Sequence, residues 1–152
     1  MQQAQQIEVT ESSSRVDLVA VPPDGVRNLW PLAEPLLAKA TDLSTKLDTD
    51  DILQQCEIKD MQLWLAVDAD NVYAAIVTDM LTYISGWKVV RVLACGGSRL
   101  FKWRLAVDER ITAFARLEGC DAVEIIGMDF WENVFPGFEK IETVFSKELR
   151  DG

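Results

Sequence analysis

The stretch from residue 88 to residue 119 constrains the fold more than any other part of this chain. An apolar run over residues 89–94 leads into Cys-Gly-Gly-Ser-Arg, and apolar residues then recur at steps of three and four. That spacing is typical of a helix with one face against a core. The apolar stripe consists of Leu100, Trp103, Val107, Ile111, Phe114 and Ala115. We therefore predict a strand, a tight glycine turn and a helix over residues 99–118.

A second apolar run, residues 121–126, begins directly after Gly119 and is too short to be a helix. A strand, a helix of this length and another strand form a right-handed crossover, which places the two strands parallel to each other. We therefore predict that residues 89–94 and 122–126 are parallel neighbours in one sheet.

The glycine turn between the strand and the helix has two interpretations. Such a turn directs free backbone N–H groups and the positive end of the helix dipole at one point, where an anion such as a pyrophosphate can bind. A two-glycine turn is also an ordinary connection between a strand and a helix. The residue pattern alone leaves both interpretations open.

The N-terminal half of the chain predicts one strand and two helices. Residues 16–21 alternate as a strand, which two prolines end. Two further prolines interrupt the next apolar pattern, so we expect a helix over residues 31–41 with Pro31 in its first turn. Thr49 is the expected N-cap of a further short helix.

The middle of the chain changes to the periodicity of strands. Residues 62–67 and 72–83 are joined by a four-residue polar turn, and a Ser-Gly turn leads on to the strand at 88–94. These three strands form an antiparallel meander. After the crossover, a short helix ends at a Pro-Gly pair, and residues 139–149 alternate as a last strand. The pattern thus predicts a sheet of about six strands flanked by about four helices.

The composition indicates a single domain that needs no disulfide. A chain of 152 residues, 49% of them hydrophobic, buries enough apolar surface to fold without covalent links. The N-terminus is polar and rich in Gln and Ser, so we assign residues 1–15 to an arm and residues 16–152 to one domain. In isolation such an arm is mobile, and we expect a protein partner to bind it.

Several functions are excluded by what the sequence lacks. It has no histidine, which removes the Ser/His and Cys/His nucleophile pairs and the commonest metal ligand. The three cysteines are odd in number and widely spaced, which indicates core residues of a reduced intracellular protein and no metal site. A net charge of −10 argues against nucleic acid and anionic membranes as partners. No apolar stretch reaches membrane-spanning length, and no signal peptide is expected.

The order of the elements and three stretches of sequence resemble the GNAT superfamily, the Gcn5-related N-acetyltransferases. These stretches are the strand, turn and helix over residues 89–119, Asp-Ala-Val-Glu-Ile-Ile over residues 121–126, and Asp-Phe-Trp-Glu-Asn-Val-Phe-Pro-Gly-Phe over residues 129–138. The last is similar to the family's short fourth helix, which ends in Gly-Phe. More narrowly, the chain is similar to small GNAT-like proteins of tailed phages. That likeness implies the cytoplasm of a bacterial host cell, or a virion, as its location.

The resemblance implies an α/β (α+β) fold with a mixed sheet, mostly antiparallel with one parallel central pair. The fourth and fifth strands would splay apart, and acetyl-CoA would lie between them as cosubstrate. Its pantetheine arm would pair with the backbone of Leu93 and Cys95, and its pyrophosphate would lie over the glycine turn. The implied cofactor-binding residues are Leu93, Cys95, Gly96, Gly97, Ser98 and Arg99. Arg99, Lys102 and Arg104 would offset phosphate charge.

Transfer of an acyl group to an amine also needs a general base, which in this family is a carboxylate or an ordered water. Glu124 and Asp79 are the candidates, because both lie on central strands of the predicted sheet. Each is equally suited to a solvated surface position. Family enzymes often use a tyrosine of the fourth helix to protonate the leaving thiolate. Here that helix has no hydroxyl, and Tyr73 and Tyr83 lie in the meander.

Two functions of different classes fit the sequence. The first is an acyl-CoA-dependent N-acyltransferase that acts on an amine. The second is a non-catalytic protein of the same fold that binds protein partners through its arm and acidic surface, for instance in a phage particle. The resemblance in fold favours the first, and the short glycine turn and the missing tyrosine favour the second.

Overall fold

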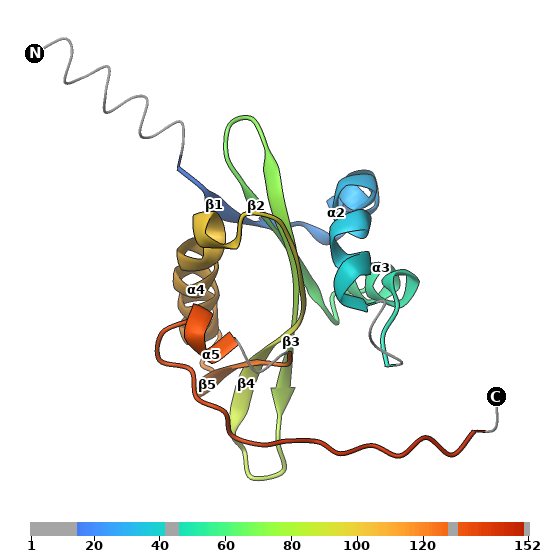
Figure 1. Ribbon diagram of the computed structural model, residues 1–152, viewed down its shortest axis with the longest axis vertical. Coiled ribbons are helices and arrows are strands. Elements are labelled where there is room, and N and C mark those ends of the chain that lie inside the picture. The colour runs from blue at the N-terminus through green and yellow to red at the C-terminus, as the bar shows by residue number, and fades with distance from the viewer. Residues whose placement is uncertain (1–14, 42–45, 128–130, 151–152) are drawn as a thin grey trace, which may run out of the picture.

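The computed structural model describes residues 15–41, 46–127 and 131–150. Its strands are β1 (Asp17–Val21), β2 (Gln62–Val67), β3 (Val72–Thr82), β4 (Lys88–Gly97) and β5 (Ala122–Ile125). Its helices are the 3-10 turn η1 (Pro23–Gly25), α2 (Val26–Thr41), α3 (Thr49–Glu57), α4 (Leu100–Leu117) and α5 (Trp131–Val134). Figure 1 shows α2 and α3 on one face of the sheet and α4 and α5 on the other.

The five strands form one sheet in the order β1-β2-β3-β4-β5. The first four are antiparallel neighbours, and β4 and β5 are parallel, with Val89 opposite Ala122. The predicted meander and crossover are therefore confirmed. The parallel pair lies at the edge of the sheet and not at its centre, because no described strand pairs with the outer side of β5.

The α4 face of the sheet holds one of two cores. Trp103 and Ile111 are each 2% exposed, and Phe114 is partly buried, with its ring 5.1 Å from the ring of Trp64 in an edge-to-face contact. The predicted helix over residues 99–118 and its apolar stripe are thus confirmed. Apolar side chains from β1, β2, β3, β4 and α5 complete this core.

The second core lies between the sheet and the helices α2 and α3. Ala33 and Leu37 of α2 and Ile52 and Cys56 of α3 are buried in it. On the outside, the guanidinium of Arg27 donates two hydrogen bonds, of 2.7 and 3.0 Å, to the carboxylate of Glu57. This pair joins the two helices but is exposed, so it contributes little to stability.

Helix α2 differs from the prediction, because it begins at Val26 and contains both Pro31 and Pro35. Both prolines are exposed, so the carbonyl groups that lose their helical donors face water. The N-cap of α3 is Asp48 and not Thr49. The Asp48 carboxylate accepts a hydrogen bond of 2.8 Å from the backbone N–H of Asp51.

The predicted glycine turn is also wrong, because β4 continues through Gly97 and only Ser98 and Arg99 separate it from α4. A Cβ on Gly96 would lie 2.0 Å from the carbonyl oxygen of Leu36 in α2, and one on Gly97 would lie 2.3 Å from the carbonyl oxygen of Tyr73. Both glycines therefore allow backbone segments to approach closely within the fold.

The predicted last strand over residues 139–149 is absent from the sheet. Residues 139–150 form no regular secondary structure and are exposed throughout. Alternation in sequence favours a strand, but a strand also needs a neighbour, and here no pairing is made. The short helix before the Pro-Gly pair is present as α5. The N-terminal arm lies outside the described residues, apart from Arg15, and stays a prediction.

Candidate functional site

The centre of the candidate site is the point where β4 and β5 part. Their pairing ends at Val92 and Ile125, with one further hydrogen bond of 3.0 Å from the N–H of Ile126 to the carbonyl of Val92. Beyond Val92, β4 runs on to Gly97, and β3 is its only neighbouring strand among those described. One side of the β4 backbone is therefore left without a strand partner in this stretch.

Leu93 is the irregular residue at this point. Val92 lies opposite Thr78 and Ala94 lies opposite Val77, so Leu93 has no partner on β3 and forms a bulge. Leu93 and Cys95, the two residues expected to pair with pantetheine, lie on the stretch of β4 that has no strand partner on the β5 side. Their role in binding stays a prediction, but their position agrees with it.

Both backbone polar groups of Ser98 are hydrogen-bonded within the protein. Its backbone N–H donates a hydrogen bond of 3.0 Å to the carbonyl of Tyr73, and its carbonyl accepts one of 2.7 Å from the indole N–H of Trp103. Arg99 then takes the left-handed conformation, with φ of 56°, and α4 begins. The backbone N–H groups suited to a phosphate are thus those of Arg99 and the first turn of α4.

The cationic side chains near the N-terminus of α4 already make contacts within the protein. The ammonium of Lys102 lies 5.1 Å from the ring centre of Tyr73, and the Arg104 guanidinium lies 5.0 Å from the ring centre of Phe101. Arg104 also donates a hydrogen bond of 3.3 Å to the carbonyl of Val134. Three cations, Arg99, Lys102 and Arg104, thus lie at the start of α4, and Lys102 also interacts with the carboxylate of Asp68.

The thiol of Cys95 is poorly suited to act as a nucleophile. Its burial raises the pKa of the thiol to about 12, so the thiol stays protonated at neutral pH. Reactive cysteines have a lowered pKa and are found as thiolates. What Cys95 offers to a ligand is therefore its backbone.

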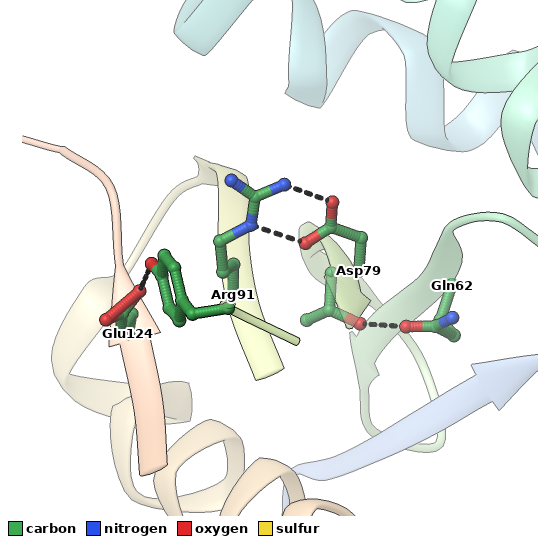
Figure 2. A network of polar contacts seen from close by, with 6 residues as sticks. Gln62, Asp79, Arg91 and Glu124 are labelled. Atoms are coloured by element: carbon green, nitrogen blue, oxygen red, sulfur yellow. Dashed lines mark hydrogen bonds and ion pairs between the residues drawn. The ribbon is translucent and has the colours of Figure 1, made fainter. Parts of the chain in front are cut away.

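Three charged residues lie in one row across the sheet beside this site. Asp79 on β3 is opposite Arg91 on β4, and Arg91 is opposite Glu124 on β5. Figure 2 shows the Arg91 guanidinium directed at the Asp79 carboxylate, with hydrogen bonds of 2.9 Å from Nε and 2.6 Å from Nη2. Both oxygens of Asp79 are thus bound, which leaves this carboxylate poorly suited to act as a base.

Glu124 is the better placed of the two predicted bases. Its Oε1 accepts a hydrogen bond of 2.8 Å from the hydroxyl of Tyr83, and this bond raises the pKa of Tyr83. Its other oxygen has no hydrogen bond to the described residues. Glu124 is half-buried and immediately precedes Ile125, the last residue of β5 that pairs with β4.

Sequence reasoning missed Arg91 and Tyr83 as neighbours of these carboxylates. The two residues meet the candidate bases only through the strand register, which the turn between Tyr83 and Trp87 sets for β3 and β4 and the crossover sets for β4 and β5. A cation on β4 opposite an acid on β3 was the one signal from which the pair could have been found.

Other polar contacts near this row hold the sheet together. The indole N–H of Trp64 donates a hydrogen bond of 2.9 Å to the hydroxyl of Thr78, which donates one of 2.8 Å to Gln62. Within the described ranges, no group of histidine, cysteine, aspartate or glutamate side chains could hold a metal ion. None of the helices described is both long and apolar enough to cross a membrane.

Solved acetyltransferase structures share this fold. An aminoglycoside acetyltransferase from an uncultured soil metagenomic sample, in complex with sisomicin, aligns with a TM-score of 0.66 at 9% identity, over 89% of this chain and 97% of its own. A predicted acetyltransferase of Clostridium acetobutylicum with acetyl-CoA gives 0.63 at 10% identity, over 88% and 96%. A ribosomal-protein-alanine N-acetyltransferase of Brucella melitensis biovar Abortus gives 0.60 at 12% identity, over 90% and 99%.

These likenesses define the chain as a protein of the GNAT fold. The structural matches include one described as a GNAT family acetyltransferase, from Staphylococcus aureus, at 16% identity and a TM-score of 0.58. No protein-family model matches the sequence, and no curated protein matches it either. The sequence-based expectation of a mixed, mostly antiparallel GNAT-like sheet is therefore confirmed at the level of structure.

Proposed function

We propose that this protein is an N-acyltransferase that binds acyl-CoA between β4 and β5. The observation that carries the proposal is the parting of the two strands after Val92, directly beside the N-terminus of α4. Solved structures of the same fold include one with acetyl-CoA and an aminoglycoside N-acetyltransferase in complex with CoA. In this chain, β4 beyond Val92 has no strand partner on the β5 side, which supports the proposal.

In this proposal the backbone of Leu93 and Cys95 pairs with the amide groups of the pantetheine arm. Arg99 and the first turn of α4 bind the pyrophosphate through backbone N–H groups, and Lys102 adds positive charge nearby. Gly96, Gly97 and Ser98 support this site from within the fold, because they pack against α2 and β3 and bond to β3.

The reaction is attack of an amine on the thioester carbonyl. A C–N bond forms, the C–S bond breaks, the amine nitrogen loses a proton and the CoA sulfur leaves as a thiolate that gains one. Glu124 accepts the amine proton, directly or through a water molecule, because its free carboxylate oxygen lies on β5 where β5 parts from β4.

Calorimetry with acetyl-CoA, followed by an assay with a panel of amines, tests this proposal. We expect acetyl-CoA to bind and to raise the melting temperature, since a ligand at 100 times its dissociation constant stabilises the native state by about 2.7 kcal/mol. Glu124→Gln should bind acetyl-CoA as the wild type does but lose most of the turnover. The matched control is Glu109→Gln on the exposed side of α4, which should leave both unchanged.

A non-catalytic function in binding protein partners is the second candidate. The observation that favours it is that the protein itself fills the space around Gly96 and Gly97 and uses both backbone groups of Ser98. It predicts no acetyl-CoA binding even at millimolar concentration, a result that would overturn the first proposal. A partner for the N-terminal arm, and a location in the bacterial cytoplasm or a virion, belong to this proposal as predictions from the sequence.

A further inference from the structure

An apolar pocket lies between the sheet and α4, at the point where β4 and β5 part. The sheet contributes Val92 and Ile125 to its lining, and these are the last two residues that lie opposite each other before the strands separate. Helix α4 contributes Val107 and Ile111, and both side chains are buried. The pocket therefore adjoins the candidate site on the α4 face of the sheet.

The size of this pocket limits what it can hold. Phe135 and Phe138, which follow α5, belong to its lining, and their ring centres are 6.0 Å apart in an edge contact. The space between the lining side chains is about 210 Å³, counting the part that opens to solvent. Pockets that hold drug-sized ligands measure about 300–1,000 Å³. This pocket therefore suits a short apolar group and not a large molecule.

Two polar side chains of α4, Asp108 and Thr112, complete the lining. Burial raises the pKa of the Asp108 carboxyl, and a hydrogen bond with Thr112 opposes that rise. A second anion brought into a partly desolvated place beside this carboxyl would be repelled. The pocket therefore favours a neutral apolar group over one that ends in a carboxylate.

The course of the proposed acyl-CoA leads to this pocket. With the pyrophosphate at the start of α4 and pantetheine paired to Cys95 and Leu93, the thioester end lies where β4 and β5 meet. The paired strands block the way within the sheet, so any longer acyl chain must turn to one face. The α2 and α3 face carries the charged row of Asp79, Arg91 and Glu124, whereas the α4 face carries the pocket. An apolar chain therefore favours the α4 face.

From this arrangement we infer that the protein uses acyl-CoA with a short, neutral acyl chain longer than acetyl, of the propionyl or butyryl class, and that this pocket binds the chain. The inference rests on the proposed function and names the class of its acyl donor. The acyl chain and the amine then occupy opposite faces of the sheet. At the acyl carbonyl the C–N bond forms and the C–S bond breaks, the amine nitrogen loses a proton to Glu124, and the CoA thiolate gains one from solvent.

Calorimetry with CoA thioesters that differ only in the acyl group tests the inference by binding alone. Each methylene group that leaves water tightens binding about fourfold, so butyryl-CoA should bind about tenfold more tightly than acetyl-CoA. Succinyl-CoA has the same number of acyl carbons but ends in a carboxylate. It should bind no more tightly than acetyl-CoA, because Asp108 repels it.

The outcomes of this titration separate the inference from the proposed function. Equal affinities for acetyl-CoA and butyryl-CoA would overturn the inference and leave the proposed function standing. Succinyl-CoA that binds as tightly as butyryl-CoA would also overturn it. If none of the thioesters binds, the proposed function and the inference both fail.

Methyl NMR of isoleucine-labelled protein locates the chain. The signals of Ile111 should shift further with butyryl-CoA than with acetyl-CoA, because only the longer chain reaches α4. Ile84, which is fully exposed in the turn between β3 and β4, is the internal control and should shift with neither. Tighter binding of butyryl-CoA without this additional shift of Ile111 would show that the chain lies elsewhere, and the inference would be wrong.

Substitutions at Val123 change the size of the pocket from the β5 side. Val123 belongs to the lining but is only half-buried, so its side chain can be exchanged with little disturbance of the core. Val123→Phe should fill the pocket and bring the affinities for butyryl-CoA and acetyl-CoA within about twofold of each other. Leu105→Phe, which adds a ring at an exposed position of α4, is the control and should keep the tenfold ratio.

Val123→Ala is the complementary variant and enlarges the same pocket. It should bind hexanoyl-CoA more tightly than the wild type does, by about fourfold for each further methylene group that enters. A folded Val123→Phe protein that keeps the wild-type ratio would overturn the inference. If Val123→Phe fails to fold, as judged by circular dichroism, Val123→Ala decides, and no gain for hexanoyl-CoA would count against the inference in the same way.

Discussion

Gly96 lies where the backbone of α2 passes against the sheet, and this contact leaves no room for a side chain. A methyl group there would meet the Leu36 carbonyl oxygen at 2.0 Å, which is backbone and cannot swing aside. We predict that Gly96→Ala destabilises the fold by about 2–3 kcal/mol or more, because helix and strand must separate. Denaturant unfolding monitored by tryptophan fluorescence measures this loss.

Gly25→Ala is the matched control, since a Cβ there meets nothing nearer than 3.9 Å. We expect it to be neutral or stabilising by about 0.4–1 kcal/mol, because alanine reduces the freedom of the unfolded chain. Equal effects of the two substitutions would show that the close approach of Leu36 to Gly96 has been misassigned.

Tyr83 and Glu124 form the polar pair that lies beside the proposed site. The hydrogen bond to Glu124 raises the pKa of Tyr83 above its ordinary value of 10.0. The pair therefore stabilises the fold at neutral pH, and this contribution is lost as the pH rises above about 10. In Glu124→Gln we predict that the pKa of Tyr83 falls, as measured by carbon NMR of labelled tyrosine.

Glu109→Gln, on the exposed side of α4, is the control in that titration and should leave the midpoint of Tyr83 as it is in the wild type. An unchanged midpoint for Tyr83 in Glu124→Gln would mean that the two side chains do not meet in solution.

At the scale of elements, α4 contributes buried side chains to the core on its side of the sheet, and it also holds Ser98 in the loop that precedes it. Trp103 is 2% exposed, and its indole N–H holds the carbonyl of Ser98 at 2.7 Å. We predict that Trp103→Ala costs about 3–5 kcal/mol of unfolding free energy. Phe101→Ala, at a position 77% exposed on the same helix, should change it by less than about 0.5 kcal/mol. A cost below about 1 kcal/mol for Trp103→Ala would contradict the assigned core.

The sequence predicted well the elements that have a strong hydrophobic periodicity and whose connections allow only one arrangement of the strands. The crossover from β4 through α4 to β5 followed from one apolar stripe between two apolar runs, and the meander followed from its short turns. The predictions were wrong where contacts between residues distant in the sequence determine the local structure. Pro31 continues α2 because it faces water, Gly97 is in β4 because Tyr73 packs against it, and residues 139–149 lack a partner.

The candidate site could be predicted only in part for the same reason. Leu93 and Cys95 lie on the stretch of β4 that parts from β5, as the resemblance implied. The engagement of Asp79 by Arg91 and the internal bonds of Ser98 depend on strand register and on the contact with β3. For the first contact, the only sequence signal is an acid in β3 and a cation in β4, and the second contact has no local signature.

At the scale of the whole molecule, one sheet separates two cores and ends in a parallel pair that opens at one end. The helix that joins this pair begins beside the opening, so a strand backbone and a helix N-terminus lie next to each other. This arrangement is the basis for proposing acyl-CoA binding. In the proposal, one acyl-CoA molecule contacts two separate segments of the chain, Leu93 to Cys95 and Arg99 to Phe101.

A titration of the ¹⁵N-labelled full chain with acetyl-CoA, followed by amide NMR, tests this claim most directly. We predict that the amide signals of residues 93–95 and 99–101 shift together and saturate, while those of the exposed α3 residues do not move. Saturable binding that shifts signals elsewhere, or no shift at millimolar acetyl-CoA, would contradict it.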